Sequence, residues 1–129
     1  MPIPINHAGG PLTAKLEILN AHIGTYAVDI WDDADGSGTP SSGDKFVKRA
    51  KDFGDNVANV ALGSAAEMTN KTVRFIWGAT AGNTGDKKSI VEVSIDQGGQ
   101  PLAGFPKKVE ANFQAGQHHG VFHVFYFLT

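Results

Sequence analysis

Hydrophobic and polar residues alternate with a period of two along much of the chain. From Leu12 to Ile18, apolar residues occupy every second position and polar residues lie between them. Successive side chains of a β-strand point to opposite faces of its sheet, so this alternation predicts a strand with one buried and one solvated face. Tyr26, Val28 and Ile30 continue the pattern and predict a second strand whose apolar face is formed by these three residues.

Three later segments show the same alternation and are rich in β-branched and aromatic residues, which favour strands. Their apolar positions are Val73, Phe75 and Trp77; Val91, Val93 and Ile95; and Val109, Ala111 and Phe113. Val57–Leu62 is a shorter candidate strand. Val121–Leu128 is apolar on both faces apart from His123, and this composition predicts a central strand that is covered on both sides.

Seven or eight short strands joined by Gly-, Asn- and Asp-containing turns predict an all-β fold, an antiparallel β-sandwich with Greek-key or jelly-roll-like connections. Residues 45–53 are ambiguous, because Phe46, Ala50 and Phe53 fit helical spacing whereas Phe46 and Val47 could begin a strand. A strand is the favoured interpretation of this segment, and one short helical turn near 45–53 is the alternative. Pro2 and Pro4 predict an extended N-terminal arm over residues 1–11, followed by a single domain over residues 12–129.

Composition narrows the classes of function. The chain has 129 residues, enough for one domain, and the absence of cysteine excludes disulfide scaffolds and thiolate chemistry. The net charge of −2 lacks the excess of positive charge that is typical of nucleic-acid-binding proteins. No stretch approaches the roughly 20 apolar residues that span a bilayer. The N-terminal residues do not resemble a signal peptide, so cytoplasmic and mature secreted locations both remain open.

An acidic, Gly-rich segment follows the second predicted strand. Four aspartates lie within seven positions: Asp29, Asp32, Asp33 and Asp35. Clustered carboxylates on a flexible loop can bind calcium, but the spacing does not match an EF-hand, because Trp31 stands where its first Asp belongs. We therefore expect a solvated loop that needs no cofactor, with a calcium site as the less favoured alternative. Basic residues gather just after it, at Lys45, Lys48, Arg49 and Lys51, and are expected to neutralise the loop across a bend.

Trp31 is the most suggestive single residue. If Tyr26, Val28 and Ile30 face the core, alternation directs Trp31 outward, beside Asp29 and the acidic segment. An exposed indole flanked by carboxylates can stack on a sugar ring and accept hydrogen bonds from its hydroxyl groups. The favoured alternative is that Trp31 closes the rim of the sandwich or lies under the second sheet, because large aromatic side chains are usually mostly buried.

No catalytic motif is present, and the histidines do not form an evident metal site. His119 and His123 would share a strand face but lie about 13 Å apart, too far for one ion. The sequence therefore predicts a non-enzymatic, lectin-like binding module that recognises a carbohydrate or other small polar ligand through end loops. Its expected ligand-binding residues are Trp31, Asp29, Asp32, Asp33 and Asp35, with no catalytic and no metal-binding residues. The alternative is a self-assembling structural protein, a secreted, virion or inclusion component, that packs through its sheets or its arm.

Overall fold

The computed structural model describes residues 2–20, 23–54, 57–80, 88–114, 117 and 119–129. It contains nine strands and one short helix, in this order: β1 (Leu12–Ile18), β2 (Ile23–Asp32), β3 (Lys45–Lys51), β4 (Val57–Gly63), α1 (Ala65–Met68), β5 (Lys71–Thr80), β6 (Lys88–Gln97), β7 (Gln100–Pro101), β8 (Lys107–Asn112) and β9 (His119–Phe127). Within these described residues no helix is long and apolar enough to cross a membrane.

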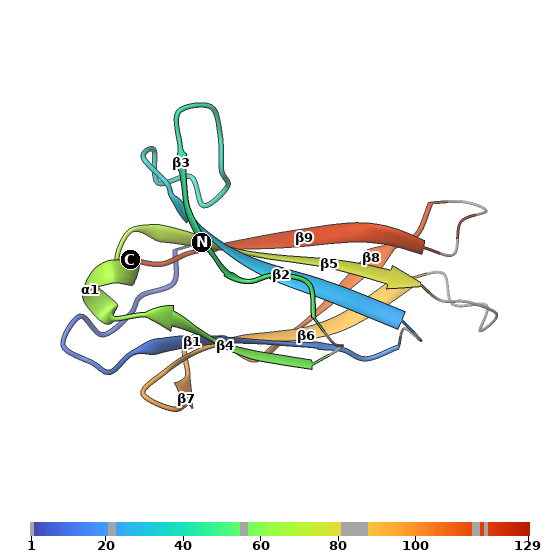
Figure 1. Ribbon diagram of the computed structural model, residues 1–129. Coiled ribbons are helices and arrows are strands. Elements are labelled where there is room, and N and C mark those ends of the chain that lie inside the picture. Colours follow the sequence, from blue (N-terminus) through green and yellow to red (C-terminus); the bar gives the residue numbers. More distant parts are fainter. Residues whose placement is uncertain (1, 21–22, 55–56, 81–87, 115–116, 118) are drawn as a thin grey trace.

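The strands form two antiparallel sheets that pack face to face (Figure 1). The five-stranded sheet has the order β4-β1-β6-β7, with β8 also paired to β6. The four-stranded sheet has the order β3-β2-β5-β9. This architecture confirms the predicted all-β sandwich.

The core lies between the sheets and is built from the inward positions of the alternating pattern. Tyr26, Val28 and Ile30 are buried as predicted, and Phe75 and Trp77 are the largest fully buried side chains. The indole Nε1 of Trp77, on β5, donates a hydrogen bond of 3.1 Å to the Oγ of a serine on β6, so its polar atom is satisfied across the core.

Residues 45–51 form strand β3, so the alternative of a helical turn near 45–53 is wrong. This edge strand is exposed on both faces, so no buried face imposes a period of two on its sequence. The helix lies instead at 65–68, and Ser64 and Glu67 form its capping box. The Ser-x-x-Glu spacing of that box was the sequence signal that could have located it.

Both ends of the chain meet at one edge of the four-stranded sheet. The predicted central position of the last strand is wrong, because among the described strands β9 pairs only with β5 and lies at the edge of the sheet. Within the N-terminal arm, Ile3 and Ile5 are buried, and the backbone N–H of Ile3 donates to the carbonyl of Phe127 at 2.7 Å. The arm thus packs against its own domain, beside the end of β9.

Candidate functional site

The outer face of the four-stranded sheet brings together most of the predicted site residues. Side chains that are neighbours in register form rows across this face. The row next to the β2–β3 connection contains Phe46, Trp31, Thr72 and Phe127. The following row contains Arg49, Asp29, Arg74 and Phe125. The connection itself, which we name loop 33–44, stands above this face in Figure 1.

Trp31 lies on the outer face, as alternation predicts, and is half-buried there. Its ring meets Phe46 edge-on at a centroid distance of 5.4 Å, and the guanidinium of Arg74 lies 5.5 Å from its centroid. The indole Nε1 of Trp31 and the Nε of Arg74 are both buried and have no hydrogen-bond partner among the described residues. This part of the face therefore combines an aromatic surface with two neighbouring unpaired donors.

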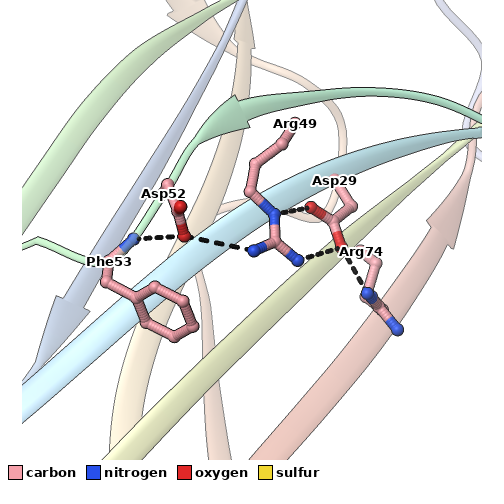
Figure 2. A network of polar contacts seen from close by, with 5 residues as sticks. All are labelled: Asp29, Arg49, Asp52, Phe53 and Arg74. Atoms are coloured by element: carbon pink, nitrogen blue, oxygen red, sulfur yellow. Dashed lines mark hydrogen bonds and ion pairs between the residues drawn. The ribbon is translucent and has the colours of Figure 1, made fainter.

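Asp29 is not available to a ligand, which corrects its predicted role as an exposed acceptor. Its exposed fraction is 0 %, because Arg49 and Arg74 enclose it on the neighbouring strands. Figure 2 shows its carboxylate accepting hydrogen bonds from the Nε of Arg49 at 2.7 Å, from the Nη2 of Arg49 at 3.2 Å and from the Nη2 of Arg74. Arg49 also pairs with the exposed Asp52.

The two arginines also determine how Asp29 titrates. Burial alone would raise its pKa, but the hydrogen bonds and charges of Arg49 and Arg74 outweigh burial and hold the pKa below its ordinary value. We expected the basic cluster to be neutralised by the acidic loop. Instead, Arg49 pairs with Asp29 and Asp52 and not with loop 33–44. Within the described residues, Lys45, Lys48 and Lys51 form no ion pair.

Loop 33–44 folds back over the outer face, held there by Asp33. This aspartate is 5 % exposed and accepts hydrogen bonds from the backbone N–H of Gly38 at 2.6 Å and the hydroxyl of Thr72 at 2.9 Å. Gly38 has φ +82°, and a Cβ there would lie 3.3 Å from the Cβ of Phe127. Glycine at this position therefore lets the loop approach β9 closely. Asp32, at the base of the loop, is exposed and lies 3.8 Å from the Nζ of a lysine on β5.

Asp33, Asp35 and Asp44 bring carboxylate oxygens within 4.8 Å of one another. Asp35 accepts from the backbone N–H of Ser37 at 2.9 Å and the hydroxyl of Ser41 at 3.1 Å. Its contact with the Asp33 carboxyl group, followed by these donors, lowers the pKa of Asp35, so it is ionised at neutral pH. Such a cluster can offer oxygen ligands to a hard cation, although serine and backbone donors already occupy several of the oxygens. Asp44 was not among the predicted site residues.

A cavity of about 170 Å³ lies between loop 33–44 and β9. Its lining is formed by Pro2, Gly36, Ser37, Gly38, Thr39, Phe125 and Phe127. The loop contributes backbone and hydroxyl groups, which form most of the accessible lining, and the two phenylalanines border the cavity on β9. Sequence reasoning missed both phenylalanines, because it assigned them to a covered central strand; the apolar outer positions of that strand were the signal.

A larger cavity, of about 350 Å³, lies on the outer face of the five-stranded sheet. There Asp96, which is 2 % exposed, pairs with the Nζ of Lys15 at 2.9 Å and accepts from the hydroxyl of Ser94 at 2.6 Å. No aromatic ring lines this cavity, and its most buried carboxylate already has partners within the chain. It is therefore less suited to stacking a ligand than the face that carries Trp31.

The described histidines do not take part in a cluster of potential metal ligands. Within the described residues, the only group of three or more potential ligands within metal-binding distance is the aspartate cluster, and it contains no histidine. His22 and His118 lie outside the described residues.

Comparison of the chain with protein-family models, curated proteins and solved structures finds no match.

Proposed function

We propose that this protein is a non-enzymatic binding module that recognises a saccharide on the outer face of its four-stranded sheet, beside loop 33–44. The observation that carries the proposal is the placement of aromatic rings on both sides of a polar loop. Trp31 and Phe46 lie in the row next to the loop on one side, and the half-buried Phe125 on β9 borders the cavity on the other.

The chemistry of this surface suits a sugar. The C–H faces of a pyranose ring stack on aromatic side chains, while its hydroxyl groups need both donors and acceptors. Asp35 supplies an exposed, ionised acceptor, and the backbone of residues 36–39 supplies further polar groups at the cavity wall. The cavity is smaller than the roughly 300–1,000 Å³ of pockets for drug-sized molecules, which favours one sugar unit rather than an enclosed oligosaccharide.

A glycan array with the full chain, in the presence of calcium and in the presence of a chelator, tests the proposal. We expect binding to at least one glycan, and a loss of at least about tenfold in affinity for Trp31→Ala and for Phe125→Ala, since each removes a stacking surface. Phe53→Ala is the matched control, because Phe53 is a 65 % exposed aromatic residue outside the loop and the cavity.

The two calcium conditions separate two roles of the aspartates. Binding that needs calcium would indicate that Asp33, Asp35 and Asp44 hold the ion, whereas binding that is indifferent to calcium would leave them as hydrogen-bond acceptors. The proposal fails if no glycan binds in either condition, or if the Trp31 and Phe125 variants bind as tightly as the Phe53 control.

A further inference from the structure

Strand β9 presents a free backbone edge. It pairs with β5 on one side, and on the other side only its end is occupied, where the carbonyl of Phe127 accepts from the N–H of Ile3. Backbone groups of alternate residues in a strand point to the same side. Val121, His123 and Phe125 therefore direct their N–H and C=O groups away from β5, and none of these groups has a backbone partner on that side among the described residues.

This edge lacks the features that normally prevent strands from pairing between molecules. Edge strands are usually protected by lysine, by proline or by a bulge that breaks the register. The sequence of β9 contains no Lys, Arg, Asp, Glu or Pro, and its nine-residue register with β5 is uninterrupted. Its exposed side chains include Val121, the most exposed large hydrophobic residue of the described chain at 71 %.

The opposite edge of the same sheet is protected. Strand β3 has three lysines and one arginine among seven residues, and its register with β2 shifts twice. Pairing of two β3 strands would bring like charges together. In the five-stranded sheet, β8 contains Lys107, Lys108 and Glu110. The other edge, β4, carries no charge, but it has seven residues and its register with β1 shifts once. Among these edges, β9 is the one that combines nine residues, an uninterrupted register and no acidic residue, lysine or arginine.

We propose that two copies of this chain associate through β9, in antiparallel orientation, to form one continuous eight-stranded sheet. A two-fold axis gives each outward N–H and C=O of one β9 strand a partner on the other. Because Ile3 occupies the edge at Phe127, the paired segment is confined to residues 119–126 and its axis passes near His123. The two-fold axis is perpendicular to the sheet, so the outer faces of both copies point in the same direction.

The association is expected to be weak and dependent on concentration. It joins two strand edges and does not bury whole sheet faces, and interfaces of small area are typical of transient complexes. An obligate dimer is not expected, since the core of each copy is already closed by its own two sheets.

Sedimentation equilibrium of the full chain from about 1 μM to about 1 mM tests the proposal. We expect the mass to rise from that of one chain to that of two. The backbone N–H groups of Val121, His123 and Phe125 should become protected from hydrogen exchange over the same concentration range. His123→Lys should weaken the dimer by at least about tenfold, because position 123 lies opposite its own copy at the two-fold axis and the change places like charges beside each other.

Leu19→Lys is the matched control, since it adds the same charge at a 42 % exposed leucine outside β9 and should leave the dimer intact. Val121→Lys provides a second β9 variant if His123→Lys does not fold. A chain that stays monomeric at about 1 mM overturns the proposal. So does a dimer that persists in a folded β9 variant, or one in which the three N–H groups stay unprotected, because either result places the interface elsewhere.

Discussion

Replacement of Asp29 by asparagine is expected to lower the free energy of unfolding by about 2–3 kcal/mol at pH 7. Removing one partner of a fully buried ion pair costs roughly 3–5 kcal/mol, because the other charge is left without compensation. Here Asp29 is fully buried, but the side chains of Arg49 and Arg74 retain exposed fractions of 34 % and 22 %. Water can therefore solvate part of the freed guanidinium groups, and the remaining amide oxygen can still accept one hydrogen bond, so the expected cost lies below the full range.

Urea unfolding with linear extrapolation measures this difference in free energy. Asp52→Asn is the control, since it makes the same chemical change on a carboxylate that also pairs with Arg49 but is 65 % exposed. Exposed ion pairs contribute up to about 1 kcal/mol, so the Asp52 variant should remain close to the wild type. If the Asp29 variant differs from the wild type by less than about 1 kcal/mol, the network in Figure 2 does not stabilise the fold as we infer.

The pH dependence gives a second test of the same residue. Because the pKa of Asp29 in the folded protein lies below its ordinary value, its stabilising contribution is present above the unfolded pKa of about 3.9. The contribution is lost as the pH falls through the folded pKa, where the carboxylate takes up a proton. The difference between wild type and Asp29→Asn should therefore shrink on acidification below about pH 4, and a constant difference would contradict the depressed pKa.

Three further changes in stability are expected, each measured by the same urea unfolding. Phe75→Ala should cost roughly 3–5 kcal/mol, because Phe75 is fully buried between the sheets; a cost near 1 kcal/mol would contradict its place in the core. Ser64→Ala should cost about 1 kcal/mol through loss of the hydrogen bond that the Glu67 N–H donates to the Ser64 hydroxyl at 3.1 Å, and Ser64→Thr should recover most of it. Deletion of residues 1–5 should destabilise the domain by at least about 2 kcal/mol, because Ile3 and Ile5 are buried in its core; unchanged stability would show that the arm does not contribute.

The candidate site could be predicted only in part. Alternation placed Trp31 on the outer face, and the run of aspartates located the polar loop beside it. Asp29 lies two residues before Trp31 and so faces the same side of the sheet. Whether its carboxylate is free for a ligand depends on Arg49 and Arg74, which lie 20 and 45 positions away and become its neighbours only through strand pairing. No local pattern could reveal that its carboxylate is already occupied.

The sequence by itself determined the all-β class, the faces of most strands and the position of the turns, because these depend on residues that are close along the chain. Tyr26, Val28 and Ile30 had to share a face whatever sheet they joined. Only the tertiary structure decided that β9 lies at an edge. Its apolar residues on both faces resembled those of a central strand, but here the outer ones lie partly beneath loop 33–44. The cavity also depends on tertiary structure. Gly36 and Phe127 both line it, but they are far apart in the sequence and become neighbours only in the folded chain. Sheet order is set by contacts between distant segments, and a period of two carries no information about which strand becomes the neighbour of which.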